Sequence, residues 1–325
     1  MLLINKLEDP ILMRGLGVDK KMKKDFICIK DLTPEEISDI FVLAHDLKQD
    51  KSKFGSALSG KTLALIFQKP SNRTRVSFEV GMCQLGGYSI YLGPEEINLG
   101  VRESIKDVAK TLSRYVDIIV LRTFAHDNLL EMAKHASIPV INGLSDLLHP
   151  CQALADIYTV KEQLGRLKGL TLAYIGDGNN VCHSLLYGSA KVGMNMNLAV
   201  PKGYQPQDFI LREAKSLAQK SGAKINLFSK PEEAVKNADV IYTDVWASMG
   251  QEKEAKKRKA AFKRYQINKK LLSQAKRGCL IMHCLPAHRG EEITDEVIDS
   301  KHSIVFDQAE NRLHVQKTIL IKLLG

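Results

Sequence analysis

Several short polar segments carry side chains of the types that bind anions and polarise carbonyl groups. Each follows an apolar segment typical of a buried strand. These segments are Ser71-Asn72-Arg73-Thr74, Arg122, His149-Pro150-Cys151-Gln152, Gly176-Asp177-Gly178-Asn179-Asn180, Ser248-Met249-Gly250 and Cys284-Leu285-Pro286. In open α/β sheets, ligands bind beyond the carboxyl ends of the parallel strands, so six polar segments at those ends predict one cleft between two sheets.

The segment 71–75 has the features of a phosphate site. Ser71 precedes a helical period and is a natural N-cap. The first turn of such a helix offers free backbone N–H groups and the positive end of a dipole, and Arg73 adds a guanidinium fork that matches a phosphate. The alternative is an ordinary capped helix with exposed arginines, in which Arg75 pairs with Glu79 one turn further on.

The glycine-rich segment 176–180 does not predict a dinucleotide site, although it follows a strand and opens a helix. The third glycine of the G-x-G-x-x-G pattern falls at Val181, and the next strand ends at Val200 and Pro201 without an acid to hold a ribose. The sequence also contains no G-x-x-x-x-G-K-[ST] phosphate loop.

His149 and Cys284 each have more than one interpretation. A lone histidine is most often structural, but His149 and Gln152 at a helix start could aim two donors at a carbonyl oxygen. Cys284, four residues before His288, could be a nucleophile, although no neighbouring group is evident to lower its pKa. A metal site made of His283, Cys284 and His288 would lack a fourth ligand at the usual spacing. We therefore expect no metal and no cofactor.

Strand-like and helix-like segments alternate along most of the chain, which is typical of α/β folds with mainly parallel sheets. The expected strands are 61–67, 88–92, 116–121, 138–142, 170–176, 196–200, 224–228, 239–246 and 278–284. The expected helices are the period after Ser71, 103–114, 128–136, 150–164, 181–193, 207–220 and 309–324. At roughly 150 residues per domain, 325 residues predict two domains, with a boundary near 150–165.

Composition narrows the class of protein. The proportions of hydrophobic (44%) and charged (26%) residues are globular, no apolar run approaches the ~20 residues that span a bilayer, and the N-terminus is a poor signal peptide. The six cysteines form no C-x-x-C pair and predict reduced thiols in the cytoplasm.

The net charge of +10, partly concentrated in 20–24 and 256–259, fits solvated helix faces, a nucleic-acid surface or a basic cleft for an anionic substrate. The motifs favour the cleft.

With these residues in view, the chain resembles the aspartate/ornithine carbamoyltransferases, and most closely their ornithine branch. The matching segments span roughly residues 25–325 and are FQKPSNRTRVSFE, NLGVRESIKD, INGLSDLLHPCQALAD, IGDGNNVCHS, DVWASMGQE, HCLPAHRGEEITDEV and AENR. S-x-R-T-R with H-P-x-Q is specific to the family. D-x-x-x-S-M-G with H-C-L-P is specific to the ornithine branch.

The resemblance implies two α/β domains, each with a mainly parallel sheet flanked by helices, joined by interdomain helices. Residues 24–157 would bind carbamoyl phosphate, with a C-terminal helix at 310–325 returning to them, and 158–309 would bind ornithine. Residues 1–23 precede the first regular unit, and from the sequence alone they are an N-terminal arm or a frayed end. The resemblance also implies a homotrimer, or a multiple of trimers, with active sites between subunits. From composition and charge we expect no nucleic-acid or membrane partner. The reaction would transfer the carbamoyl group of carbamoyl phosphate to the δ-amine of L-ornithine, giving L-citrulline and phosphate, as in arginine metabolism.

The matched motifs carry over the family's site residues. Arg122, His149 and Cys284 would be the catalytic groups. The carbamoyl phosphate contacts would come from Ser71, Asn72, Arg73, Thr74, Arg122, His149, Pro150, Cys151, Gln152, Cys284, Leu285 and Arg312, and those to ornithine from Asn180, Asp244, Ser248 and Met249. Asn98 would reach the neighbouring subunit's site. Two residues depart from the family pattern: Asn72 replaces the usual Thr, and Asn98 is shorter than the Gln or His of many relatives.

The implied chemistry needs a neutral amine and a stabilised oxyanion. An alkyl amine has a pKa of about 10.4 in water, and desolvation in a closed cleft lowers it, so activity is predicted to rise between about pH 6 and pH 9. Two alternatives remain: a sister carbamoyltransferase that uses putrescine or a modified ornithine, and a non-catalytic binding protein that keeps the cleft.

Overall fold

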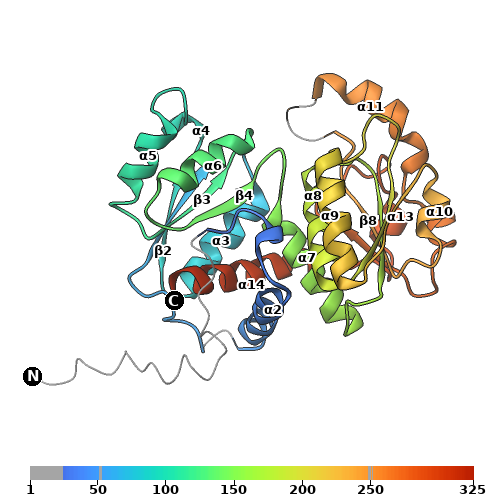
Figure 1. The fold of residues 1–325 in the computed structure, drawn as a ribbon, viewed down its shortest axis with the longest axis horizontal. Helices are drawn as coiled ribbons and strands as arrows, with labels where there is room; N and C mark the ends of the chain where they lie inside the picture. The colour runs from blue at the N-terminus through green and yellow to red at the C-terminus, as the bar shows by residue number, and fades with distance from the viewer. Residues whose placement is uncertain (1–24, 51–52, 248–249, 251) are drawn as a thin grey trace, which may run out of the picture.

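The computed structural model describes residues 25–50, 53–247, 250 and 252–325, in which two all-parallel sheets form the cores of two lobes (Figure 1). The first sheet has the order β2-β1-β3-β4 and consists of β1 (Thr62–Phe67), β2 (Tyr88–Leu92), β3 (Ile118–Arg122) and β4 (Val140–Leu144). The second has the order β7-β6-β5-β8-β9 and consists of β5 (Thr171–Ile175), β6 (Asn195–Ala199), β7 (Ile225–Phe228), β8 (Val240–Thr243) and β9 (Leu280–His283). The predicted fold class is confirmed.

Helices connect and cover the strands of both sheets. The first lobe contains α2 (Pro34–Gln49), α3 (Asn72–Gln84), α4 (Pro94–Ile97), α5 (Ile105–Leu112) and α6 (His126–His135). The second contains α8 (Asn180–Val192), α9 (Asp208–Ser221), α10 (Pro231–Val235), α11 (Ala255–Phe262), α12 (Lys269–Leu272) and α13 (Asp295–Ile298). Two helices, α7 (Pro150–Leu164) and α14 (Val305–Leu324), run where the lobes meet (Figure 1). The 3-10 turns are η1 (Ile29–Asp31), η2 (Glu252–Glu254) and η3 (Lys263–Tyr265).

Each expected strand is present, with ends that differ by up to a few residues. The largest difference is in the strand expected at 239–246, which ends at Thr243. Sequence analysis missed α2 altogether, although its start signal is clear. Thr33 and Glu36 form a capping box there, and Pro34 occupies the first helical turn. The arm expected for 1–23 lies outside the described residues.

The helical period after Ser71 contains two apolar lines, and α3 buries one of them. Phe78 and Met82 are fully buried in the first core, whereas Val76 and Val80 are 48% and 39% exposed. Removal of apolar surface from water stabilises the folded protein, so the face of α3 that carries Phe78 and Met82 packs on the core. The Val76 line is left as an apolar surface.

Helix α14 crosses from one lobe to the other. Its first residue, Val305, packs in a core of the second lobe, and its later residues Ile319 and Leu320 pack in the large core that includes the first lobe. In between, α14 packs against α2, α3 and α7 (Figure 1). Its middle carries Arg312, which is 1% exposed. No helix in the described part of the chain is both long enough and apolar enough to cross a bilayer.

Candidate active site

The polar segments at the strand ends of both sheets line one cavity of about 660 Å³. The residues singled out from the sequence that line it are Ser71, Arg73, Thr74, Arg122, His149, Gln152, Asn180, Asp244, Cys284, Leu285 and Arg312. Asn72, Pro150 and Cys151 adjoin lining residues but are not part of its wall, and Ser248 and Met249 lie outside the described residues. Because these residues come from both sheets, the cavity is a cleft between the lobes.

Three guanidinium groups converge on the end of the cleft formed by the first lobe. Arg73 lies in the first turn of α3, Arg122 ends β3, and Arg312 comes from α14. Burial, and then the nearby Arg312 and Arg73, lower the pKa of Arg122 to about 10. Its Nε atom is buried without a hydrogen-bond partner. The three guanidinium groups repel one another, and a bound anion would offset that repulsion.

The start of α3 supplies further anion-binding groups. Ser71 is the N-cap, with its hydroxyl accepting from the N–H of Thr74 at 3.2 Å. The Thr74 hydroxyl accepts from Arg312 Nη2 at 3.0 Å, which leaves the hydroxyl proton to be donated to a ligand. Arg75, by contrast, pairs with Glu79 at 3.0 Å as in the structural alternative. Thus Arg73 belongs to the cleft and Arg75 to the surface of the helix.

His149 is a neutral imidazole at the N-terminus of α7. Its pKa lies well below the usual value because of its burial and then because of Arg312, Arg122 and Arg73. Its Nδ1 atom is buried and has no partner. Its backbone N–H donates to the Ser184 hydroxyl of α8 at 2.8 Å, so His149 is fixed to both lobes. A neutral, unpaired imidazole in this position can donate to a carbonyl oxygen.

Gln152 is oriented differently from the prediction. Its Nε2 donates to Asp156 at 2.8 Å, and its Oε1 accepts from Arg312 Nη1. Asp156 is an acceptor, so the amide nitrogen points away from the cleft. Gln152 therefore presents an oxygen to the cleft and not a second donor for a carbonyl oxygen.

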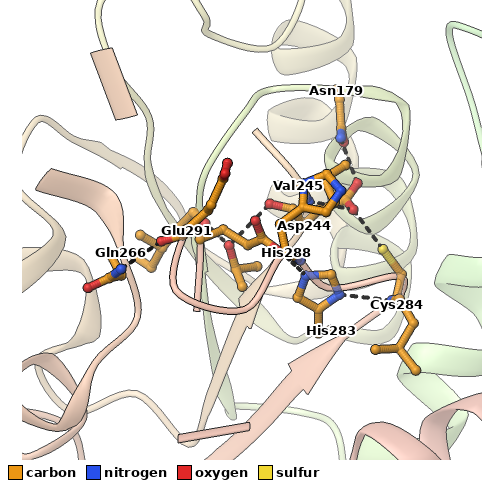
Figure 2. A network of polar contacts seen from close by, with 12 residues as sticks. Asn179, Asp244, Val245, Gln266, His283, Cys284, His288 and Glu291 are labelled. Carbon is orange, nitrogen blue, oxygen red and sulfur yellow. Dashed lines mark hydrogen bonds and ion pairs between the residues drawn. The ribbon is translucent and has the colours of Figure 1, made fainter. Parts of the chain in front are cut away.

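The second lobe contributes a carboxylate and a thiol (Figure 2). The Cys284 thiol donates to Asp244 Oδ1 at 3.0 Å, and Asn179 Nδ2 donates to Asp244 Oδ2 at 2.7 Å. Asn180 Nδ2 donates to the Ser145 carbonyl oxygen at 2.6 Å, which joins the two lobes at the floor of the cleft. Asp244 is 6% exposed and suits a substrate ammonium group.

The Cys284 thiol is neutral. Burial, and then the charge of Asp244, raise its pKa well above the usual value, so a thiolate nucleophile is not available. Asp244, His283 and Cys284 offer atoms within 4.8 Å of one another, but both ring nitrogens of His283 are already bonded. Nδ1 accepts from the Leu285 N–H at 2.8 Å, and Nε2 lies 3.1 Å from Glu292. These bonds hold the turn at Leu285 and do not suit a metal ligand.

The turn at Leu285 bridges the cleft. Leu285 has a φ of 57°, in the left-handed region, and its carbonyl oxygen accepts from Arg73 Nη2 at 2.5 Å. This carbonyl therefore faces the end of the cleft that holds Arg73. Asn98 is exposed, ends α4 and does not line this chain's own cleft.

The glycine-rich segment 176–180 has a packing role. A Cβ on Gly178 would lie 2.2 Å from the Pro206 nitrogen, and Gly176 has a φ of 150°. Gly178 thus allows residues 201–206 to pack against the strand end. Close packing accounts for this glycine without a dinucleotide.

Sequence analysis assigned no individual role to three polar residues that line the cleft, Lys69, Asn179 and Arg258. Lys69 is 5% exposed, pairs with Asp146 and lies 4.1 Å from the centre of the Phe124 ring. Its position two residues before Ser71 was a usable signal. Asn179 was overlooked in favour of its neighbour. Arg258 belongs to the basic run 256–259, for which the sequence allows a solvated face, a nucleic-acid surface or a basic cleft; it lines the cleft, is 7% exposed and pairs with Asp177 at 2.8 Å.

Comparisons with known proteins agree along almost the whole chain. The profile described as "Aspartate/ornithine carbamoyltransferase, carbamoyl-P binding domain" matches residues 24–162, and the profile described as "Aspartate/ornithine carbamoyltransferase, Asp/Orn binding domain" matches 168–323. The chain is 54% identical over 304 residues to an ornithine carbamoyltransferase of Pyrococcus horikoshii, covering 93% of this chain and 96% of that protein. It is 54% identical over 303 residues to one of Anoxybacillus flavithermus, with the same coverage.

Solved structures give the same result. The structure titled ornithine carbamoyltransferase from Pyrococcus furiosus superposes with a TM-score of 0.90 at 52% identity, covering 93% of this chain and 97% of that one. The structure of the Gloeobacter violaceus protein superposes with a TM-score of 0.86 at 45% identity, covering 94% of this chain and 100% of that one.

Proposed function

The chain belongs to the aspartate/ornithine carbamoyltransferase family, and we infer that it transfers the carbamoyl group of carbamoyl phosphate to the δ-amine of L-ornithine, giving L-citrulline and phosphate. The observation that carries this inference is the polarity of the cleft. The first lobe and α14 place Arg73, Arg122 and Arg312 in the cleft, and the second lobe places the carboxylate of Asp244 there, while its Arg258 is neutralised by pairing with Asp177. A dianionic donor and a cationic amino acid fit these two sides of the cleft.

The phosphate of the donor substrate lies at the start of α3 in this proposal. Ser71, Asn72, Arg73 and Thr74 hold it, with Asn72 contributing its backbone N–H in the first helical turn. Asn72 is not part of the cavity wall, so its replacement of the family's Thr leaves the wall unchanged. Lys69 adds a buried cation at the same end.

The carbamoyl group lies between α7 and the turn at Leu285. Arg122 and His149 donate to its carbonyl oxygen, and Gln152 and the Leu285 carbonyl accept from its NH2 group. Pro150 and Cys151 support this end of α7. In the tetrahedral intermediate the oxygen becomes an anion, and each well-placed donor there is worth about 3 kcal/mol. Arg312 closes the cleft and holds Thr74 and Gln152.

The amino-acid end of ornithine lies in the second lobe. Asp244 receives the α-ammonium group, Asn180 lies beside it, and Ser248 and Met249 are assigned from the family motif. Holding the two substrates in line can supply roughly 7–11 kcal/mol of the barrier in the best cases. The neutral Cys284 thiol, bonded to Asp244, lines the path of the δ-amine. The amine attacks the carbonyl carbon, the C–O bond to phosphate breaks, and the phosphate takes up the proton.

The assembly and the domains follow the family. We propose a homotrimer, or a multiple of trimers, because α3 and β2 expose Val76, Val80, Tyr88 and Ile90, and large apolar patches mark interaction sites. Asn98, outside this chain's cleft, would reach a neighbour's cleft. Residues 24–157 with the end of α14 would bind carbamoyl phosphate, and 158–309 ornithine. The six unpaired cysteines support a cytoplasmic location.

A substrate panel tests the function. Purified protein is mixed with carbamoyl phosphate and, separately, ornithine, putrescine, N-acetylornithine or aspartate, and phosphate and the ureido product are measured. We expect product with ornithine. Product with another amine instead would contradict the assigned acceptor, and no product with any of them would favour a non-catalytic binding protein.

A further inference from the structure

The amide of Asn179 connects the start of α8 to the ornithine end of the cleft. Asn179 is the N-cap of α8, and its Oδ1 accepts from the N–H groups of Val181 at 3.0 Å and Cys182 at 3.1 Å. The Tyr174 hydroxyl lies 3.3 Å from the same oxygen, but its nearer acceptor is the Asp177 carbonyl oxygen at 2.9 Å. The two backbone donors on one side fix the amide oxygen there. The amide nitrogen must therefore face the other way, toward Asp244.

The carboxylate of Asp244 is held by donors on both of its oxygens (Figure 2). Oδ2 accepts from Asn179 Nδ2 at 2.7 Å, and Oδ1 accepts from the Cys284 thiol at 3.0 Å and the Val245 N–H at 2.8 Å. Asn179 follows β5 and Asp244 follows β8, and these strands are neighbours in the sheet. The bond from Asn179 thus ties two adjacent strand ends and sets the plane of the carboxylate.

We propose that Asn179 is a positioning residue for the amino-acid substrate: its amide holds Asp244 in the orientation that receives the α-ammonium group of ornithine. This inference rests on the proposed function. Helix capping alone does not require an asparagine here. Aspartate caps a helix equally well and suits the positive end of the helix dipole, but it has no N–H2 group to give to Asp244. The structure uses both ends of the amide, one for α8 and one for Asp244.

The variant Asn179→Asp separates these two uses. It keeps the acceptor that caps α8 but replaces the donor with a second carboxylate in contact with Asp244, and like charges at this distance repel. We expect the KM for ornithine to rise about 10- to 100-fold, as for loss of a hydrogen bond to a charged group, with smaller changes in kcat. The KM for carbamoyl phosphate should stay near its wild-type value, whereas the Tm should fall because two carboxylates are in contact.

Two further variants complete the test. Asn268 caps α12 through the Leu271 N–H, so Asn268→Asp makes the same chemical change at a cap outside the cleft and should leave both KM values unchanged. Asn179→Ser keeps a good cap, is too short to reach Asp244 and adds no charge. We expect it to raise the KM for ornithine by about tenfold. It decides the question if Asn179→Asp does not fold.

The proposal is wrong if Asn179→Asp or, failing that, Asn179→Ser uses ornithine as well as the wild type. It is also wrong if Asn179→Ser, which adds no charge, changes both KM values and the Tm together, because that pattern indicates a structural role for Asn179. Wild-type turnover tests the function by itself. If the wild type converts ornithine but the variants have an unchanged KM for it, the role of Asn179 is wrong and the proposed function stands.

Discussion

Arg122 is the side chain whose removal should cost the reaction most. Its Nε is buried and unpartnered, and two other guanidinium groups crowd it in the cleft. We expect Arg122→Ala to lower kcat/KM for carbamoyl phosphate by at least about 100-fold, because a charged contact to the transition state is lost. Arg122→Lys, which keeps the charge but not the planar fork, should recover a small part of the activity. Steady-state kinetics measure both, and Arg114→Ala on the surface is the control. An active Arg122→Ala enzyme would contradict the role.

The pH dependence of the rate should come from the substrate amine and not from His149. Burial is the main cause that lowers the pKa of His149 well below its usual value, so we expect no titration of this imidazole to shape the rate near neutral pH. The δ-amine must lose a proton, so kcat/KM for ornithine should rise by up to tenfold per unit between about pH 6 and pH 9. The affinity for carbamoyl phosphate, measured without ornithine, should not share that slope. If it does, a group of the protein is titrating.

The same histidine makes the fold sensitive to acid. In the unfolded chain an imidazole binds a proton below its ordinary pKa of about 6.5, whereas buried His149 does not. The unfolded state then binds more protons, so this group lowers the free energy of unfolding as the pH falls below about 6.5. The variant His149→Gln should show a shallower loss of stability between about pH 6.5 and pH 4.5 in urea titrations. An unchanged slope would place the acid sensitivity elsewhere.

At the scale of elements, Asp156 joins three parts of the structure that carry cleft residues. Its carboxylate is fully buried in α7 and accepts from Gln152 of the same helix, from the Tyr242 hydroxyl of β8 and from Gln308 of α14. Burial is the main cause that raises its pKa to about 6 from 3.8. The charged carboxylate thus costs stability at neutral pH.

The raised pKa of Asp156 makes the free energy of unfolding depend on pH in a direction that can be measured. The folded state binds more protons than the unfolded state between about pH 4 and pH 6, so this group's contribution to stability is largest at low pH and is lost as the pH rises through about 6. A shift of this size corresponds to roughly 3 kcal/mol. The wild type should therefore lose more unfolding free energy between pH 4.5 and pH 8 than Asp156→Asn does. Relative to the wild type, the variant should be more stable at pH 8 than at pH 4.5. Equal differences in the two proteins would contradict the assignment.

The sequence predicts the strand ends well, because apolar strands followed by polar segments are a local pattern. It predicts which polar segments meet, because parallel strands end at one rim. It does not predict the roles within a segment. Asn179 and Asn180 are neighbours of one type, yet Asn179 bonds Asp244 and Asn180 bonds Ser145 across the lobes. The Gln152 orientation likewise depends on Asp156, Tyr242 and Gln308, which come together only in the folded chain.

At the scale of the whole molecule, the exposed face of α3 and β2 predicts an assembly. Val80→Glu adds a charge to that face without touching the core, since Val80 is 39% exposed. We expect the mass in light scattering to fall from about three times 36.3 kDa, or a multiple of that, to that of one chain, with loss of activity through the neighbour's Asn98. Phe209→Glu, on a 41% exposed side chain of the second lobe, is the control. A wild-type monomer, or an intact Val80→Glu assembly, would contradict the proposal.

The path of α14 has a consequence for how the protein is made. The first sheet is complete at Leu144, but α14, which packs on α2 and α3 and supplies Arg312, begins only at Val305. At about 5–20 residues per second, the ribosome needs roughly 10–30 s to add the segment between them. During that time the first lobe exposes the apolar surface that Ile319 and Leu320 will later cover. Exposed apolar surface of this kind is what chaperones bind. Until α14 is translated, the nascent chain lacks Arg312 and cannot complete the proposed phosphate site.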